Sequence, residues 1–530
     1  MSMKIAVVGS GPAATASVLA LVARGIRPDV IDIGERLDPE RMALATSLAG
    51  KRVSDWPIEL VRRLSESRVD RRGDFPRKPL FGSDYMYARE RAYGRVETVD
   101  VDFVPTHAAG GFSTIWGAAM LPMHADDMTA WPVSARDLEP HYRAIAAALP
   151  LTAAHDALEK SFPIFRTEFG TARQSKPNRL LLASLQRRDV DGDLNFRIGR
   201  ARLALRDSGS HACVGAGLCF TGCPVGAIYS TTDTLDVLEG ERKLRRRDGY
   251  AVLSVEEKQG SVGLELLHVA DNKTETVEYD RVFLAAGAVN TSRILLNSRR
   301  MFGVCAMLRD SQKVLLPVLL LRRLGRLGRE DVPSLAGLFI DLKLEKDSSH
   351  WFHGQVYSVN DQLLRRFGID PFVSTPPWQR PLRAFLDHVL VLLCSMHSDH
   401  SSAIALSIAP DIAKSMPLVR LAAIRNPAST YYVRHLRKAM SRMLRRGGAY
   451  VMGRTEFTLP GAGAHLGGSF PMRANPRSEL ETDLLGRPFG WRRVHVVDGA
   501  CFPSIPATTI TFPLMANAHR IASQVDLTGA

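Results

Sequence analysis

One short segment near the start of the chain limits the possible folds more than any other. Residues 4–8 have the apolar pattern of a buried strand, and Gly9-Ser10-Gly11-Pro12-Ala13-Ala14 follows them directly. An Ala-, Val- and Leu-rich helix is predicted next, and a second predicted strand, residues 29–33, carries Asp32 near its end. A strand, a glycine turn, a helix and an acidic residue in this order predict a Rossmann-like dinucleotide-binding unit.

The residue types in this motif match what a dinucleotide requires. Gly9 and Gly11 let the backbone turn tightly and approach a pyrophosphate, whose negative charge would lie at the helix N-terminus. Asp32 would accept hydrogen bonds from ribose hydroxyls. Ala14 stands where a third glycine is usual. The motif alone does not distinguish FAD from NAD.

Length and composition favour a large globular protein. The chain has 530 residues, of which 45% are hydrophobic and 23% charged, so it can bury a sizeable core. The net charge of +14 fits a solvated surface, an anionic membrane surface or an anionic substrate, because residues of both signs are spread along the chain. The Arg-rich run at residues 245–247 lacks interleaved aromatic residues, so we expect no nucleic-acid binding.

The sequence predicts a cytoplasmic protein. No apolar stretch reaches the roughly 18 residues that a membrane-spanning helix needs, and the first residues lack the pattern of a secretory signal. Residues 431–446 predict a basic amphipathic helix with Leu436 and Met440 on its apolar face. Such a helix either lies on an anionic membrane or packs its apolar face on the protein, so peripheral attachment at the inner face of the membrane stays open.

Later regions complete the predicted organisation. Residues 105–135 are rich in Gly, Ala, Trp and Met and predict a buried loop against a flat cofactor. Residues 250–255, 263–269 and 281–284 have strand patterns, with a polar turn at residues 270–276. Residues 301–450 have no glycine motif, which favours a separate domain that covers the substrate.

Four motifs along the chain resemble those of the glucose-methanol-choline oxidoreductases. Residues 110–117 (GGFSTIWG) are similar to the family's flavin-facing loop, and residues 282–291 (VFLAAGAVNT) to its second signature. Residues 465–469 (HLGGS) and 496–504 (VVDGACFPS) are similar to its closing motifs. They occur in the family's order, and the chain is most similar to pyranose- and glucose-oxidising members.

The resemblance implies an α/β fold with two domains. Residues 1–300 and 451–530 would form a discontinuous, Rossmann-like FAD-binding domain, and residues 301–450 an α+β substrate-binding domain. FAD would be bound non-covalently, because Ile115 stands where some members carry a histidine that is bonded to the flavin. The residues assigned to FAD are Gly9, Gly11, Pro12, Ala13, Ala14, Asp32, Gly110, Gly111, Ser113, Trp116, Val255, Ala286, Gly287, Asp498 and Gly499.

The resemblance also assigns the catalytic residues. His465 matches the family's histidine base, and an imidazole suits this role because its pKa lies near working pH. The second active-site position, His or Asn in most members, falls at Thr509, with Thr508 and Thr511 as neighbours to test. A threonine can orient a substrate oxygen but cannot act as a base.

Three of the six cysteines, Cys213, Cys219 and Cys223, lie close together within residues 211–230. Their spacing lacks one residue of the ferredoxin pattern, because position 216 is Ala. They resemble the cysteine motif of FAD-dependent sugar dehydrogenases, in which three thiolates hold a [3Fe-4S] cluster. The alternative is that the thiols only pack within a loop.

A second group of possible metal ligands is His397-Ser398-Asp399-His400. No further ligand has a recognisable spacing from it, so we interpret these residues as polar groups of the substrate domain.

The function predicted from the sequence is FAD-dependent oxidation of a CH–OH group of a sugar or another alcohol to a carbonyl. Two alternatives stay open. One is a peripheral membrane dehydrogenase subunit that passes electrons through a cysteine-bound cluster to a quinone or cytochrome partner. The other is a non-redox, flavin-containing lyase.

Overall fold

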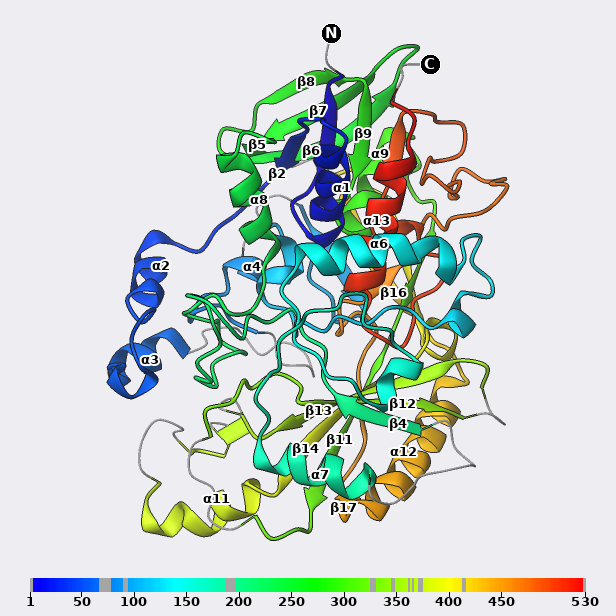
Figure 1. Ribbon diagram of the computed structural model, residues 1–530. Coiled ribbons are helices and arrows are strands. Elements are labelled where there is room, and N and C mark those ends of the chain that lie inside the picture. The colour runs from blue at the N-terminus through cyan, green and yellow to red at the C-terminus, as the bar shows by residue number, and fades with distance from the viewer. Residues whose placement is uncertain are drawn as a thin grey trace.

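The two halves of the fold lie one above the other in the computed structural model (Figure 1). The parallel sheet with the N-terminal motif lies in the upper half, and a large antiparallel sheet in the lower half. The structure describes residues 3–65, 78–88, 94–186, 196–324, 330–344, 348–360, 363–364, 367–369, 375–411 and 416–527.

A five-stranded parallel sheet contains the N-terminal motif, with strand order β20-β9-β1-β2-β5. Its central strands β1 and β9 read as near-continuous apolar runs because every residue of them is buried. The predicted strand, helix and strand of the motif are confirmed to within about two residues of each end. The elements are β1 (Ile5–Val8), α1 (Pro12–Ala23), β2 (Asp29–Asp32), β5 (Arg245–Asp248), β9 (Arg281–Leu284), α9 (Ala288–Ser298), β20 (Val494–Val496) and α13 (Thr511–Gln524).

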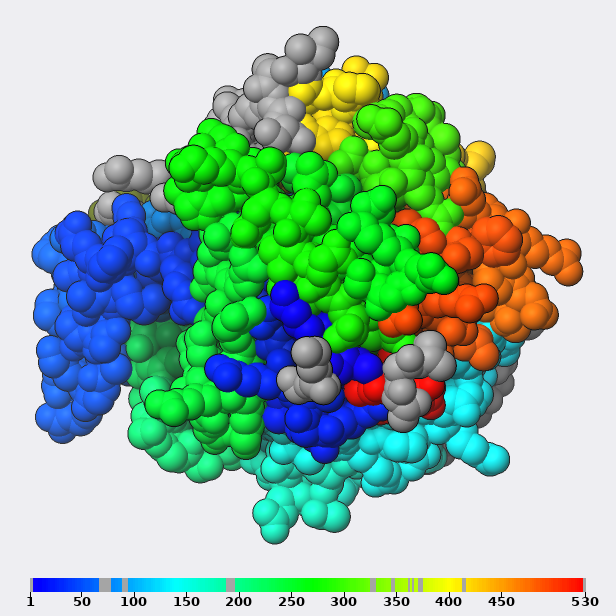
Figure 2. Space-filling model, turned by 90° about the horizontal axis from the view of Figure 1, so that it is seen from above, coloured from blue at the N-terminus to red at the C-terminus, as the bar shows by residue number. Residues whose placement is uncertain are grey.

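Three distant parts of the chain meet at this sheet. Figure 2 shows the blue N-terminal segment beside green middle segments and red C-terminal segments on one face. Helices α1 and α13 pack against each other although they lie at opposite ends of the chain. A discontinuous FAD domain was predicted, and the strands of the parallel sheet come from separate parts of the chain.

An antiparallel meander lies beside the parallel sheet. It consists of β6 (Tyr250–Glu257), β7 (Val262–His268) and β8 (Thr274–Tyr279). The sequence places a polar turn at residues 270–276, but β8 already begins at Thr274. The charged and threonine residues of β8 face solvent, which removes the apolar alternation that would have marked the strand.

The lower half has a large antiparallel sheet with its own core. The strand order is β17-β11-β14-β13-β12-β4, and β18 pairs with β11 beside β17. Helices α7 (Lys176–Gln186) and α12 (Ser429–Arg446) contribute to this core. The strands are β4 (Phe196–Arg200), β11 (Lys313–Leu320), β12 (Leu338–Lys343), β13 (Trp351–Ser358), β14 (Val389–Ser395), β17 (Ala449–Val451) and β18 (Glu456–Phe457).

A smaller sheet connects the two halves, with strand order β19-β10-β15-β16-β3. It contains β3 (Val96–Val99), β10 (Ala306–Asp310), β15 (Ala403–Ala409), β16 (Leu418–Ile424) and β19 (Leu466–Gly467). Strand β19 brings the HLGGS motif to β10, where Asp310 pairs with Leu466. Sheet membership therefore crosses the linear boundaries at residues 300 and 451, since β3, β4 and α7 come from the first segment.

The remaining helices lie on the surface or between the sheets. They are α2 (Pro39–Thr46), α3 (Ile58–Ser65), α4 (Tyr85–Ala88), α6 (Ala135–Ala148), α8 (Thr231–Gly240) and α11 (Arg380–Leu386). Across the described residues, every helix is too short or too polar to cross a membrane. Helix α12 is the predicted basic helix, and Leu436, Met440 and Met443 of its apolar face are buried in the core of the large sheet.

The first glycine of the motif is required by packing. Gly9 has φ of +104°, and a Cβ at this position would lie 2.4 Å from the carbonyl oxygen of Ala285. Strand β9 ends just before Ala285, so any side chain at Gly9 would push apart β1 and β9.

We expect Gly9→Ala to destabilise the protein by at least about 2 kcal/mol, because it combines a disfavoured φ with a backbone clash. Thermal unfolding followed by circular dichroism measures the effect. Gly25→Ala is the matched control, since Gly25 has φ of +76° and a Cβ added there would have no atom within 4 Å. Equal losses in the two variants would show that φ alone matters.

Candidate active site

A cavity of about 1360 Å³ extends between the parallel sheet and the large antiparallel sheet. It exceeds the roughly 300–1,000 Å³ of most small-molecule sites. Gly11 and Asp32 line it on the side of the parallel sheet, and Lys313 and His465 line it on the other side. The cavity therefore connects the dinucleotide motif with the predicted base.

The N-terminus of α1 faces this cavity. Gly11 precedes the helix and offers no side chain to cap it, so the first backbone N–H groups of α1 are available to an anion. Ser10 Oγ donates a hydrogen bond to Asp32 Oδ2. Burial raises the pKa of Asp32 to about 7, although the hydrogen bond from Ser10 lowers it. Asp32 lines the cavity at the end of β2, and its role as a ribose acceptor stays a prediction.

The loop that follows residue 105 is tied to the motif. Gly110 N donates to Ser10 Oγ over 2.8 Å, and Ser113 Oγ donates to the carbonyl of Gly110 over 2.6 Å. Trp116 Nε1 donates to the carbonyl of Tyr229 over 2.8 Å. These bonds hold Ile115 and Trp116 in the cavity wall, where a loop against a flat cofactor was predicted.

A second helix N-terminus, that of α9, borders the same cavity. Gly287 precedes α9, and its N–H donates to Asp498 Oδ2 over 2.9 Å. Asp498 also accepts from Thr291 Oγ1 and, over 2.9 Å, from Ala500 N. Burial raises the pKa of Asp498 to about 6, while these hydrogen bonds lower it. Asp498 thus joins the end of β20 to the start of α9.

Most of the residues assigned to FAD line the cavity. They are Gly9, Gly11, Pro12, Ala13, Asp32, Gly111, Trp116, Ala286, Gly287, Asp498 and Gly499. Ala14, Gly110, Ser113 and Val255 do not line it. Ala14 and Val255 are packed in the core, and Gly110 and Ser113 hold the loop in place.

Val252 and Arg293 are among the lining residues that were not found from the sequence. Val252 lies on β6, the strand that also contains Val255, and it lines the cavity in its place. Arg293 on α9 also lines it; Nη2 donates to the carbonyl of Val252 over 2.9 Å, while Nε and Nη1 have no partner among the described residues. Single residues on a strand or helix leave no motif that would mark them.

His465 lies at the far end of the cavity beside a buried lysine. The Nζ atom of Lys313 is 2.8 Å from His465 Nδ1 and donates to Ser395 Oγ over 3.0 Å. Burial lowers the pKa of His465 well below its ordinary value of 6.5, and Lys313 lowers it further. Burial also lowers the pKa of Lys313 from 10.5 to about 7, although Asp310 raises it. His465 is therefore a neutral imidazole at physiological pH.

Thr509 lines the cavity as well. Its Oγ1 donates to the carbonyl of Ala119 over 3.2 Å, which leaves the oxygen's lone pairs for a ligand. Thr511 also lines the cavity, whereas Thr508 is buried outside it. Of the three threonines considered from the sequence, Thr509 and Thr511 are thus placed to touch a ligand.

The cavity wall opposite the parallel sheet has a polarity gradient. Residues that alternate along β11, β14 and β13 face the cavity, and the register sets them in rows. The row next to His465 pairs Lys313 with Ser395 and Ser395 with His353. The rows beyond it consist of Leu315, Leu393 and Gln355, and then Val391 and Tyr357. One polar row is thus followed by a largely apolar surface.

The three cysteines of residues 211–230 gather in one partly buried loop. Burial raises the pKa of Cys219 to about 12, with smaller contributions from Cys223 and Cys213. Ala227 N donates to Cys223 Sγ over 3.3 Å. Nothing among the described residues supports the [3Fe-4S] cluster, and a protonated, buried thiol fits the packing interpretation.

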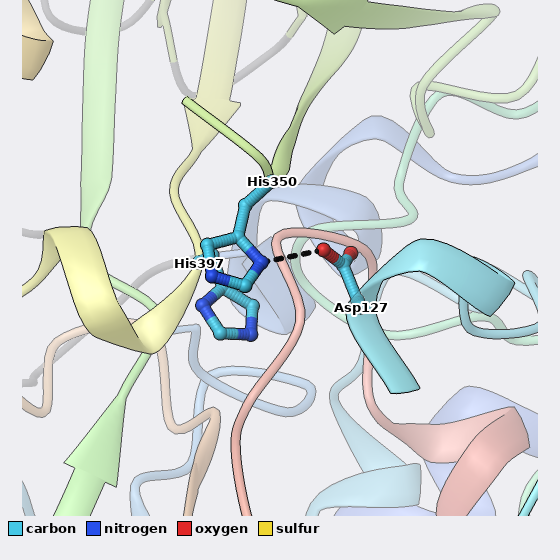
Figure 3. A group of neighbouring side chains, drawn as sticks. All are labelled: Asp127, His350 and His397. Atoms are coloured by element: carbon cyan, nitrogen blue, oxygen red, sulfur yellow. Dashed lines mark hydrogen bonds and ion pairs between the residues drawn. The ribbon is translucent and has the colours of Figure 1, made fainter. Parts of the chain in front are cut away.

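A histidine pair joins the upper loop to the lower sheet (Figure 3). His350 Nδ1 is 2.9 Å from Asp127 Oδ1, and its Nε2 is 3.2 Å from Asp399 Oδ2. The rings of His350 and His397 stack with centroids 3.6 Å apart and planes 9° apart. Although burial lowers it, the hydrogen bonds to the two carboxylates raise the pKa of His350 to about 9. His350 is therefore an imidazolium held between two aspartates.

The group is poorly shaped for a metal ion, although Asp127, His350 and His397 bring ligand atoms within 4.8 Å of one another. A metal lies about 2.0–2.1 Å from an imidazole nitrogen, close to the ring plane. Two stacked, nearly parallel planes 3.6 Å apart at their centroids cannot both contain one such ion. The sequence missed Asp127 and His350 as partners of the residues around His397, because only the fold brings them together.

The histidine pair predicts a pH-dependent contribution to stability. The pKa of folded His350 is above the ordinary value, so this contribution is full below about pH 6.5 and is lost as pH rises through about 9. We expect His350→Gln to lower the unfolding free energy by roughly 1–3 kcal/mol at pH 6 and by less at pH 10. Thermal unfolding at both pH values measures this.

The matched control is His155→Gln, because His155 is exposed and contacts only Glu159 and the ring of Phe169 among the described residues. Its effect should be small at both pH values. A loss in His350→Gln that does not change with pH would contradict the imidazolium, and a rise in wild-type melting temperature on adding Zn²⁺ that His350→Gln abolishes would indicate a metal site instead.

Comparison with known proteins supports the fold. The chain matches no protein-family model and no curated protein sequence. A solved structure, that of pyridoxine 4-oxidase from Mesorbium loti, is similar with a TM-score of 0.58 and 14% identity, and the match covers 99% of each chain. At this identity the likeness shows the fold alone. The chain thus has the predicted α/β fold, a Rossmann-like domain joined to a second domain built on the large antiparallel sheet.

Proposed function

We propose that the protein is an FAD-dependent oxidoreductase that oxidises the CH–OH group of an alcohol to a carbonyl, with His465 as the base. The observation that carries the proposal is the continuity of the cavity from the glycine motif to His465. A solved protein of the same fold is named as an oxidase of an alcohol, pyridoxine, which is consistent with this chemistry.

The residues around the upper cavity fit FAD. The N-terminus of α1 provides N–H groups for a pyrophosphate, whereas the turn before α9 is capped by Asp498, which lines the same cavity. Gly9 allows the backbone to pass where a Cβ has no space, and Asp32 is a ribose acceptor at the end of β2. The unpaired guanidinium nitrogens of Arg293 add a donor group for a polar part of the cofactor.

The residues around the lower cavity fit general-base chemistry. FAD, when bound, supplies the hydride acceptor. His465 is neutral at working pH and lines the cavity, and its Nε2, the ring nitrogen that Lys313 does not engage, takes the hydroxyl proton of the alcohol. Thr509 Oγ1 accepts a hydrogen bond from the substrate and orients it. Ile115 and Trp116 exclude water from the reacting atoms.

The polarity gradient of the wall defines the substrate class. A hydroxyl fits the polar row beside His465. The rows beyond it contain Leu315, Leu393 and Val391. Their two polar side chains, Gln355 and Tyr357, bond to each other, so these rows offer a sugar ring few hydrogen-bond partners. A buried hydroxyl without a partner costs about 1–3 kcal/mol. We therefore favour a primary or secondary alcohol with an apolar or aromatic body over the sugar expected from the motif resemblance.

The first test is anaerobic reduction of the bound flavin by a panel of alcohols. We expect the purified protein to contain FAD that acid precipitation releases, because Ile115 cannot bond to it. Aromatic and aliphatic alcohols should bleach the flavin absorbance faster than glucose or glycerol. Faster bleaching by sugars would overturn the substrate class, and no bleaching by any alcohol would favour the lyase alternative.

The second test is His465→Gln, which removes the base but keeps a polar side chain of similar size. We expect flavin to remain bound and the rate of its reduction to fall by about 10²- to 10⁴-fold, as for loss of a general base. Stopped-flow absorbance measures this rate. His435→Gln, on the outer side of α12, is the matched control, and an unchanged rate in His465→Gln would remove His465 from the mechanism.

The peripheral membrane alternative has a separate test. The apolar face of α12 is occupied by the core, so membrane contact would depend on its exposed basic residues alone. Sedimentation with anionic vesicles at low and high salt detects such contact. We do not include a membrane partner in the proposed function.

A further inference from the structure

Lys313, the residue beside His465, can donate or accept a hydrogen bond, depending on whether its amine is charged. Lys313 begins β11, and its Nζ lies between His465 Nδ1 at 2.8 Å and Ser395 Oγ at 3.0 Å. Its side chain is 4% exposed, and it lines the cavity beside His465. Because Nδ1 is engaged by Lys313, Nε2 is the nitrogen that a substrate can reach.

Two proton arrangements are compatible with this geometry. An ammonium at Lys313 has only donors, so it donates to Nδ1, and the proton of neutral His465 must then be on Nε2. An uncharged amine has a lone pair, so it can accept the Nδ1–H while it still donates to Ser395. Only the second arrangement leaves a lone pair on Nε2 that can take a proton from an alcohol.

The surroundings of Lys313 allow both arrangements. The titratable groups that act on it or on His465 are Asp310 on β10 and His353 on β13. Asp310 accepts a hydrogen bond from Gly461 N over 2.9 Å, and burial raises its pKa. His353 is fully buried and its pKa is lowered to about 3, so it is uncharged. No carboxylate bonds directly to the Lys313 amine among the described residues. Burial can therefore favour the uncharged amine, because no direct ion pair stabilises the charged form.

We propose that Lys313 decides which ring nitrogen of His465 carries the proton, and that it is the final acceptor of the proton taken from the alcohol. The inference rests on the proposed function for its catalytic part. In the step, the substrate O–H bond breaks and its proton binds Nε2, while the Nδ1 proton moves to Lys313 Nζ. FAD, when bound, would accept the hydride that leaves the carbinol carbon, so that the C–H bond breaks and the C–O bond becomes a carbonyl. His465 ends neutral, and the positive charge ends on Lys313.

The first experiment reads the tautomer directly and needs no substrate. Nitrogen-15 NMR of histidine-labelled protein, with the His465 signals identified by their loss in His465→Gln, distinguishes Nδ1–H from Nε2–H. We expect Nε2–H at pH 5 and Nδ1–H at pH 9, with no imidazolium form between them. The same tautomer throughout this range, or titration of His465 to an imidazolium, would overturn the proposal.

The second experiment compares variants at position 313. Lys313→Met has a similar length and no charge, so we expect its flavin-reduction rate to fall about 10- to 100-fold. The wild-type rate should rise with pH as Lys313 loses its proton, and this rise should be absent from the variant. Lys313→Arg keeps a donor and a charge but has no lone pair, so it should stay slow at every pH. A merely structural lysine would be replaced at least in part by arginine.

The matched control is Lys258→Met, since Lys258 lies on the surface and pairs with Glu278. Its rate and pH profile should equal those of the wild type. A wild-type rate and pH profile in Lys313→Met would also overturn the proposal. If no alcohol reduces the flavin, the proposed function fails, yet the NMR measurement still decides whether Lys313 sets the tautomer.

Discussion

The close contact between the two glycine turns is the constraint on which the rest of the site depends. Gly9 lies so close to the carbonyl of Ala285 that no side chain fits between them. This contact sets β1 beside β9 and thereby directs the helices that follow each strand, α1 and α9, at the same cavity. One backbone approach thus brings the uncapped N-terminus of α1 and the Asp498-capped turn before α9 to one cavity.

A second glycine contact places the base at the other side of the cavity. A Cβ on Gly467 would lie 2.2 Å from the carbonyl of Gly499, which directly follows Asp498. The HLGGS motif is therefore held against the segment that carries Asp498, the residue that accepts the Gly287 N–H at the start of α9. The spacing between the cofactor end and His465 is set by main-chain packing, which is more rigid than contacts between flexible side chains.

The parts of the site that the sequence predicted are those whose chemistry is local. The Gly9 turn, Asp32 and the HLGGS motif were each identified from a short run of adjacent residues, and residues of all three line the cavity. Lys313 was not predicted, because it is a single lysine in front of the apolar residues of β11. Its role appears only when β11 pairs with β14 and meets the segment of His465.

Contacts between distant parts of the chain also explain the other differences between the predicted and the observed lining residues and domain boundaries. Val252 and Val255 are both buried apolar residues of β6 in the same core, and the pattern of the strand alone does not tell which of them reaches the cavity. The domain boundaries at residues 300 and 451 were drawn along the chain, whereas sheet pairing draws β4 into the lower sheet through its register with β12. Pairing between distant strands has no signature in either strand alone.

Strand β13 connects the cavity wall to the contact between His350 and Asp127, which joins the two halves of the fold. It starts one residue after His350, whose ion pair with Asp127 holds the loop of residues 105–135 against the lower sheet. The same strand then contributes His353, Gln355 and Tyr357 toward the cavity side of the lower sheet. The loop carries Ile115 and the strand carries the substrate wall. The His350–Asp127 ion pair, together with the His124–Asp341 and Lys343–Asp126 contacts between the same two parts, therefore helps to set the distance between the surface that would face the flavin and the surface that would face the alcohol. Because hydride transfer depends steeply on the separation of the reacting atoms, a joint placed outside the cavity can control the reaction without contacting either ligand.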